Sequence, residues 1–331
     1  MKGRIAAVAL VSFAAALLAG PGGAAAQAGP HTAQPYPSRP IKIIVPFGPG
    51  SGADSNPRFY GEFVSRTLGQ PIVVENRPGG SGVTAALAVK GQPADGYTLF
   101  VGTNSPITVN PVVMKDLPYD PIKDFRGVFL FGLTPVAFVV GSGTPYKTIA
   151  DLVQATRNSP NPLPVGTYSA GYEIVAAWLG AATGIRLTNV PYKGLSQTVT
   201  DLAGNQVPFA AIDFSSIVPL VKDGRLRALA QTGEARMAQL PDVPTMKESG
   251  YPEIVSHVWS SIMVRSETPD AIVDKLHEAF KAAWLTPEAR NYQAGRPTVE
   301  ALHAPREMQA FVVSEYERFK TVARAAGIQP R

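Results

Sequence analysis

The sequence contains no cysteine and only four histidines. The absence of thiols excludes disulfides, thiolate zinc or iron–sulfur sites and a cysteine nucleophile. The histidines are scattered, at positions 31, 257, 277 and 303. His277-Glu278 lacks the second histidine, four residues on, that a zinc-protease helix requires. We therefore expect neither a metal site nor a cofactor.

Charged residues are also few: they make up 17% of the 331 residues, whereas apolar residues make up 45%. That balance is typical of a folded protein and excludes intrinsic disorder. At roughly 100 to 200 residues per domain, the length predicts two domains. The formal net charge is +5, but lysine and arginine form no cluster interleaved with aromatic residues. Nucleic acid is therefore not an expected partner.

No apolar run is long enough to cross a membrane. Lys2 and Arg4 precede an apolar stretch from Ile5 to Ala19, which ends at Gly20-Pro21. A transmembrane helix needs about 20 apolar residues. A positive start followed by a short apolar stretch is typical of a secretory signal peptide.

Three small residues, Ala24-Ala25-Ala26, follow that stretch. We predict a signal peptide at residues 1–26 with cleavage after Ala26, or alternatively after Ala28, and a flexible lead-in at residues 27–40. No cysteine at the cleavage site offers lipid attachment, and no twin arginine is present. The mature protein is expected to be soluble in the periplasm, with a formal charge of +3 after removal of Lys2 and Arg4.

From Ile41 onward, short apolar runs alternate with amphipathic segments, which predicts an α/β protein with mostly parallel sheets. Strands are expected at residues 41–47, 72–74, 98–101, near 165, and at 188–192, 207–212 and 226–230. Helices are expected at residues 54–68, 82–90, 148–157, 172–183, 196–205, 216–222, 269–285 and 305–326. The last two helices should pack back on the first half of the fold.

One apolar stretch, Gly127 to Val140, is too long for an ordinary strand, and Gly132 and Pro135 interrupt it. We interpret it as a crossing between two lobes, with a second crossing near Val255 to Val264. This places residues 41–137 and 258–331 in one lobe and residues 138–257 in the other.

A glycine-rich loop joins the first strand to its helix. Gly48, Gly50 and Ala53 match the relaxed dinucleotide fingerprint, and Glu75 lies where a ribose-binding acid would stand. Pro49 removes an amide inside that loop, however, and the signal peptide directs the chain away from the cytoplasmic cofactor pool. A dinucleotide site is therefore not favoured.

The same loop is suited to binding a small anion. Glycines let backbone amides approach a ligand closely, and a helix N-terminus carries partial positive charge. A carboxylate fits such a site as well as a phosphate does. The alternative is a plain strand-to-helix turn capped by Ser51 or Asp54.

Two further loops follow predicted strands at the sheet edge where open α/β sheets bind ligands. Thr103-Asn104-Ser105 offers neutral donors and acceptors, or else forms a solvated turn or helix cap. Residues 166–171 are rich in glycine and hydroxyl groups. A serine hydrolase is disfavoured there, because Thr167 replaces the first glycine of the G-x-S-x-G elbow around Ser169 and no histidine lies between positions 31 and 257.

Three single residues are ambiguous. Asp213 and Tyr192 end predicted strands and would face the cleft between lobes. Asp213 could equally cap the helix that starts near Ser216. Trp259, beside the second crossing, could form the floor of a binding site or pack in the core.

Many short motifs together resemble the periplasmic substrate-binding proteins of tripartite tricarboxylate transporters, known as TctC or Bug proteins. The resemblance spans nearly all of the mature chain and consists of many pieces in the same order. These are Tyr36-Pro37-Ser38-Arg39-Pro40, Ile44-Val45-Pro46-Phe47, Pro49-Gly50-x-Gly52-x-Asp54, residues 74–79 (VENRPG), 95–99 (DGYTL), 110–111 (NP), 117–121 (LPYDP), 124–125 (DF), 190–194 (VPYKG), 224–230 (GRLRALA) and 240–245 (LPDVPT).

The resemblance implies a two-lobed type II periplasmic binding protein, each lobe a mostly parallel sheet flanked by helices, with the ligand cleft between them. It implies a small carboxylate held by backbone and hydroxyl groups and delivered to membrane permease subunits, with no catalysis; we expect a monomer. By position the pocket maps onto Phe47, Gly48, Pro49, Gly50, Ser51, Gly52, Thr103, Asn104, Ser105, Thr167, Tyr168, Ser169, Ala170, Gly171, Tyr172, Glu173, Tyr192 and Asp213, with Trp259 as a further candidate.

One departure concerns the ligand. Where many relatives have small residues at the start of the second-lobe helix, this chain has Tyr172-Glu173. If Glu173 points into the cleft, it would repel additional carboxylates and favour a monocarboxylate or a nitrogen-bearing ligand. If it points outward, it complements the helix dipole. A sensory receptor, or a periplasmic enzyme on the same scaffold, are the alternative functions.

Overall fold

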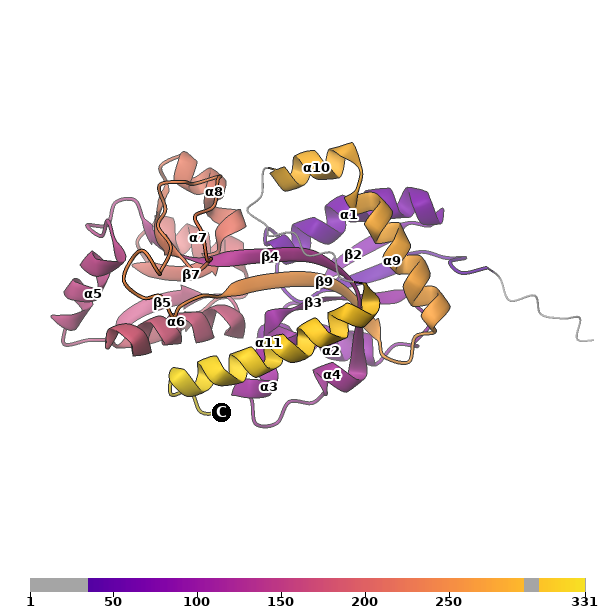
Figure 1. The fold of residues 1–331 in the computed structure, drawn as a ribbon, viewed down its shortest axis with the longest axis horizontal. Coiled ribbons are helices and arrows are strands. Elements are labelled where there is room, and N and C mark those ends of the chain that lie inside the picture. The colour runs from indigo at the N-terminus through magenta and orange to yellow at the C-terminus, as the bar shows by residue number, and fades with distance from the viewer. Residues whose placement is uncertain (1–34, 295–303, 331) are drawn as a thin grey trace, which may run out of the picture. The chain divides into compact units, whose positions relative to one another are not determined.

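The computed structural model describes residues 35–294 and 304–330, and the predicted signal peptide lies outside them. Residues Tyr36–Arg331 form the folded unit, shown in Figure 1. Its strands follow the order β2-β1-β3-β9-β4-β7-β5-β6, and β8 pairs with β4 on its other side. Because β4 takes part in two sets of pairings, we call β2-β1-β3-β9-β4 the first sheet and β6-β5-β7-β4-β8 the second sheet.

The first sheet contains the predicted parallel strands. These are β1 (Ile41–Val45), β2 (Ile72–Asn76) and β3 (Thr98–Thr103), joined by β9 (His257–Arg265). β1 pairs in parallel with β2 and β3, whereas β9 runs antiparallel to β3 and β4. In β1, Ile41 and Ile43 are fully buried, which explains its apolar sequence. Four of the five strands thus run in one direction, as predicted.

The second sheet repeats this plan. Its strands are β5 (Leu163–Thr167), β6 (Leu187–Pro191), β7 (Phe209–Asp213) and β8 (Leu226–Gln231). β5 is parallel to β6 and β7, and β4 is antiparallel to both β7 and β8. The helices that alternate with these strands are α5 (Ile149–Arg157), α6 (Ala170–Thr183), α7 (Leu195–Ala203) and α8 (Phe214–Lys222). The predicted two-lobed α/β arrangement is confirmed.

The long apolar stretch forms a single strand, β4 (Phe125–Gly141). It pairs with β9 as far as Pro135 and with β7 and β8 from Val136 onward, so it connects the two sheets (Figure 1). The prediction that Gly132 and Pro135 interrupt a strand is wrong. A shift in register between Leu130 and Gly132 absorbs the glycine, and Pro135 lies where pairing with β9 ends, so its missing N–H breaks no continuous ladder.

Helices from the N-terminal and the C-terminal parts of the sequence pack against the first sheet. α1 (Gly52–Leu68) and α2 (Val83–Lys90) follow β1 and β2, and two short helices, α3 (Asn110–Val113) and α4 (Pro121–Asp124), precede β4. α9 (Asp270–Trp284) packs on α1 and β4, as predicted, and is followed by an unpredicted α10 (Pro287–Ala294). α11 (Pro305–Ala325) packs on β4 and α3 but also reaches α6, so it supports both sheets.

Candidate functional site

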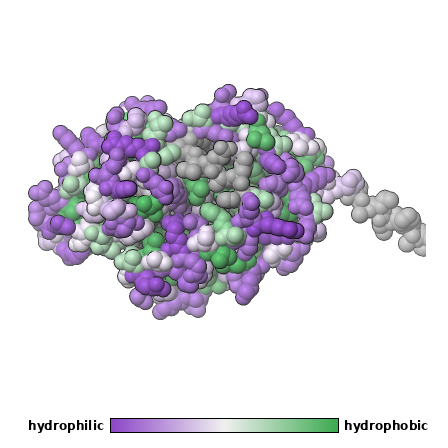
Figure 2. All heavy atoms as spheres, in the orientation of Figure 1, coloured by the Kyte–Doolittle hydropathy of each residue, from purple (hydrophilic) through white to green (hydrophobic). Residues whose placement is uncertain are grey.

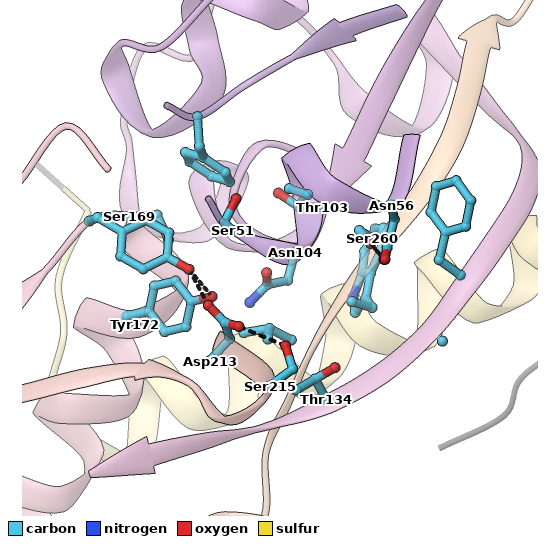
Figure 3. A pocket seen from close by; sticks show the side chains of 18 residues that line it. Ser51, Asn56, Thr103, Asn104, Thr134, Ser169, Tyr172, Asp213, Ser215 and Ser260 are labelled. Atoms are coloured by element: carbon cyan, nitrogen blue, oxygen red, sulfur yellow. Dashed lines mark hydrogen bonds between the residues drawn. The ribbon is translucent and has the colours of Figure 1, made fainter. Parts of the chain in front are cut away.

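A cavity of about 50 Å³ lies between the two sheets, at the carboxyl ends of β1, β3 and β7 (Figure 3). Loops after these strands supply one part of its wall, and the paired strands β4 and β9 supply another. Its lining residues are Phe47, Ser51, Gly52, Ala53, Asn56, Thr103, Asn104, Phe131, Gly132, Thr134, Tyr168, Ser169, Tyr172, Asp213, Ser215, Val258, Trp259 and Ser260. We call this the central cavity.

Four buried polar atoms of the central cavity lack a hydrogen-bond partner. They are Ser51 Oγ, Thr103 Oγ1, Asn104 Nδ2 and Trp259 Nε1. The exposure of each of these side chains is 4% or less. A buried polar group without a partner costs about 1–3 kcal/mol, so four of them in one cavity indicate a place for a bound molecule that accepts hydrogen bonds.

The second sheet contributes a carboxyl group surrounded by hydroxyls. Asp213 Oδ1 accepts bonds from Ser215 Oγ at 2.9 Å and from the Ser216 backbone N–H at 3.0 Å, so this residue caps α8. Asp213 Oδ2 accepts a bond from the Tyr168 hydroxyl at 2.6 Å, and Tyr168 Oη lies 2.7 Å from Tyr172 Oη. Both roles foreseen for Asp213, helix cap and cavity wall, are thus present together.

The two tyrosines remain hydroxyl donors over the physiological range. Burial raises the pKa of both Tyr168 and Tyr172, and the nearby carboxylate of Asp213 raises the pKa of each further. Phe47, in the loop after β1, packs edge-on against Tyr168, with ring centroids 5.8 Å apart. Phe47 therefore supports the tyrosine whose hydroxyl donates to Asp213.

Only part of the glycine-rich loop faces the central cavity. Phe47, Ser51 and Gly52 line it, whereas Pro49 and Gly50 are exposed. The Gly50 N–H donates to the Asp54 carboxylate at 3.2 Å, and that amide is therefore already used within the loop. An anion site at Gly50 is not what the geometry favours.

The exposed part of this loop contacts the start of α7 instead. The Pro49 carbonyl accepts a hydrogen bond from Ser196 Oγ at 3.2 Å. A methyl group added to Gly194 would lie 3.4 Å from the Gly48 Cα atom. Gly48 and Gly194 therefore bring two backbones together across the cleft.

Hydroxyls from the segments after β2 and β3 also reach the N-terminus of α6. The Ala170 N–H donates to Ser81 Oγ at 3.1 Å, and the Gly171 N–H donates to Ser105 Oγ at 2.9 Å. Ser105 Oγ in turn donates to Ser169 Oγ at 2.9 Å. Ser105 is fully buried and joins the two sheets rather than lining the central cavity.

Several remaining candidates line a second cavity of about 400 Å³ beside the first. Phe47, Tyr168 and Ser169 line both cavities. The second cavity is also lined by Pro78, Gly79, Gly80, Ser81, Thr167, Glu173, Asn189, Pro191, Tyr192 and Lys193. Burial raises the pKa of Tyr192 to about 12, with a further contribution from Asp201.

Glu173 does not line the central cavity. It is half-buried at the first turn of α6, between the second cavity and a smaller one of about 110 Å³ where Ala170 also lies. Tyr172, its neighbour, does line the central cavity. Gly171 faces the Asn104 amide, because a methyl group added there would lie 2.5 Å from Nδ2.

Sequence reasoning missed the polar residues contributed by α1, β4, α8 and β9. Asn56 Nδ2 donates to Ser260 Oγ at 3.2 Å, and both line the central cavity together with Thr134 and Ser215. Ser215 follows Asp213 closely enough that its hydroxyl could have been suspected. Thr134 and Ser260 lie within apolar strands, and no local pattern distinguishes their cavity-facing side chains.

Within residues 35–294 and 304–330, no three His, Cys, Asp or Glu side chains are grouped so that they could hold a metal ion. No helix in those two ranges is long and apolar enough to span a membrane. On the face shown in Figure 2, hydrophilic residues dominate and the apolar areas between them are small.

Comparison with known families and structures decides the assignment. The family described as the tripartite tricarboxylate transporter family receptor matches residues 58–328. The chain belongs to this family. Protein BugT of Bordetella pertussis is 30% identical over 303 residues, which cover 91% of this chain and 93% of that protein. The family assignment agrees with the motif resemblance described above.

Solved structures of similar proteins have the same fold. A Rhodopseudomonas palustris protein solved with adipate is 31% identical, with a TM-score of 0.85 over 89% of this chain and 100% of that one. MatC of the same organism, solved with malate, is 26% identical, with a TM-score of 0.82 over 87% of this chain and 99% of that one. Family members are periplasmic solute-binding receptors, and these two were solved with small dicarboxylates.

Proposed function

We propose that this chain is exported to the periplasm, captures a small carboxylate-bearing metabolite in the central cavity, and delivers it to a membrane permease of the tripartite tricarboxylate type. The observation that carries the proposal is the set of unpartnered polar atoms in that cavity, described above. Ser51, Thr103 and Trp259 can each donate to a carboxylate oxygen. The two R. palustris structures, which hold adipate and malate, support the same ligand class.

We further propose that the ligand is captured by closure of two lobes, and the arrangement of the two sheets on either side of the cavity supports this. We assign residues 41–137 and 258–331 to the first lobe and residues 138–257 to the second. Exclusion of water from the cleft strengthens each hydrogen bond to the ligand. Hinges at the two crossings, in β4 and before β9, would absorb the motion. In this proposal the protein binds its ligand without transforming it.

Mass spectrometry of small molecules released from the purified mature protein tests the ligand class. We expect a carboxylate that is recovered unchanged after prolonged incubation with the protein. Conversion of that compound would indicate an enzyme, and recovery of compounds without a carboxylate would contradict the proposal. As a control, protein unfolded and refolded before analysis should release no ligand.

The transport step needs a separate experiment. Cells that lack the gene should lose uptake of the recovered compound when it is supplied at low concentration. The gene supplied in trans should restore uptake. Retained uptake with a lost transcriptional response to the compound would instead assign the protein to sensing.

A further inference from the structure

Asp213 is the only side chain with a formal charge among the described residues that line the central cavity. It is 4% exposed, and no basic side chain in the described part of the chain forms an ion pair with it. It accepts hydrogen bonds from the hydroxyls of Tyr168, Ser215 and Ser216 and from the Ser216 backbone N–H. A buried carboxylate held only by neutral dipoles gains further stabilisation from a cation.

The opposite wall of the cavity presents hydrogen-bond donors rather than negative charge. Ser51 and Thr103 carry unpartnered hydroxyls there, and Asn104 Nδ2 is an unpartnered donor. In Figure 3, the amide nitrogen of Asn104 and the carboxylate of Asp213 project toward the same space. A molecule between them meets hydrogen-bond donors on the first-sheet side and a negative charge on the second-sheet side.

A dicarboxylate fits only half of this arrangement. One carboxylate would accept bonds from the Ser51, Thr103 and Asn104 side, but a second would lie near Asp213, where like charges repel. Asn104 and Asp213 line the same cavity and face the same space, so a short ligand held there meets both groups. A zwitterion places its carboxylate on the donor side and its ammonium group beside Asp213.

We propose that Asp213 is a specificity-determining residue that selects carboxylates bearing a protonated amine, that is, short amino acids, over dicarboxylates of the same length. This rests on the proposed function, since it takes the carboxylate-binding role of the donor wall as given. The sequence suggested that Glu173 would repel a second carboxylate and favour a nitrogen-bearing ligand. Glu173 lines the neighbouring cavities, and in this proposal Asp213 has that role instead.

Isothermal titration calorimetry with matched ligands tests the proposal. One series is butyrate, 2-aminobutyrate, 4-aminobutyrate and succinate, and a longer one is hexanoate, 6-aminohexanoate and adipate. Each series is titrated into the refolded wild-type protein. We expect the best amino acid to bind at least tenfold more tightly than the dicarboxylate of equal chain length. The compound released from the natively purified protein should contain an amine.

The decisive variant is Asp213→Asn. Asparagine is as good a helix cap as aspartate, so α8 should keep its start and the melting temperature should change little. We expect the ratio of amino-acid to dicarboxylate affinity to fall at least tenfold. Asp223→Asn, the same chemical change at the exposed end of α8, is the control and should leave that ratio unchanged.

The outcomes separate the two proposals. If the wild type prefers the dicarboxylate, or if Asp213→Asn keeps the wild-type ratio, selection by Asp213 is wrong while the carboxylate receptor stands. A released ligand that is a nitrogen-free diacid has the same meaning. If no probe binds and the released compounds contain no carboxylate, the proposed function itself is overturned.

Discussion

The unpartnered hydrogen-bond donors of the central cavity lower the unfolding free energy of the ligand-free protein. Thr103 is 3% exposed, and its Oγ1 has no hydrogen-bond partner. Its hydroxyl has therefore lost its contacts with water without gaining a hydrogen bond in the protein. A ligand carboxylate would satisfy it. Such groups should therefore lower the stability of the free protein while they raise its affinity for the ligand. A substitution that keeps the shape of the side chain but removes the hydroxyl can separate these two effects.

Thr103→Val tests this trade between stability and binding. Urea denaturation without ligand should give an unchanged unfolding free energy, or one raised by about 1 kcal/mol, because an unpaired hydroxyl is removed. Calorimetry should show affinity for the native ligand reduced roughly tenfold, which corresponds to about 1.4 kcal/mol.

The matched control is Thr108→Val, a buried threonine whose hydroxyl donates to the Asn104 carbonyl at 2.9 Å. It should lower the unfolding free energy by about 1 kcal/mol, because a satisfied bond is lost. Equal destabilisation by both substitutions would show that Thr103 has a structural partner and no role in binding.

At the level of elements, β9 begins with His257, a half-buried histidine near the charged residues of α11. Burial lowers the pKa of His257, the first residue of β9, and the nearby charge of Arg318 on α11 lowers it further. Glu315 on the same helix and Glu234 act in the opposite direction but do not outweigh these two causes. The neutral imidazole is therefore the form that fits the folded protein.

This shift predicts a pH dependence with a definite sign. The unfolded chain, in which histidine has a pKa near 6.5, binds the proton more readily than the folded protein. The stability that His257 contributes is complete above about pH 6.5 and is lost as pH falls below it through the lowered folded pKa. The lowered carboxylate pKa values, such as that of Glu75, act at more acidic pH.

Urea titrations between pH 7 and pH 5 measure this effect. His257→Asn should flatten the decrease in unfolding free energy across that interval. An equally steep decrease in the variant would show that the proton uptake belongs to another group.

For the folded unit as a whole, the lobe closure proposed above relies on the contact between Gly48 and Gly194. Gly194 has φ of 179°, extended backbone that any residue adopts, so a side chain there strains nothing locally. It would, however, enter the space against Gly48. Gly194→Leu should thus hold the lobes apart without unfolding them.

Small-angle scattering with ligand present should give a larger radius of gyration for Gly194→Leu than for the wild type, and affinity should fall at least tenfold. Gly91→Leu, at an exposed helical position after α2, is the control and should match the wild type in both measurements. If Gly194→Leu compacts normally on ligand addition, this contact is not part of closure.

Much of the fold could be predicted because buried strands and amphipathic helices leave periodic patterns. The loops after β1, β3, β5 and β7 could also be placed, since parallel strands bring their carboxyl ends to one edge. β4 could not, because its length depends on changing partners at Pro135, which no local pattern records.

The cavity itself was predictable only in part. Ser51, Thr103, Asn104 and Asp213 lie in it because they follow strands. The use of the Gly50 amide by Asp54, and of Ser105 by Gly171, depends on loops meeting in three dimensions. Side chains on the paired strands β4 and β9, such as Ser260 on β9, face the cavity only because of the way β9 is aligned with β4.

The position of β9 also affects the order in which the chain can fold. β9 lies between β3 and β4 in the sheet, although it follows both in the sequence and the whole second sheet intervenes. During synthesis, β3 and β4 therefore emerge long before the strand that joins them. Contacts of such long range form slowly. The first lobe therefore cannot be completed until residue 265 has emerged, so its strands wait for their last partner through most of the synthesis of the chain.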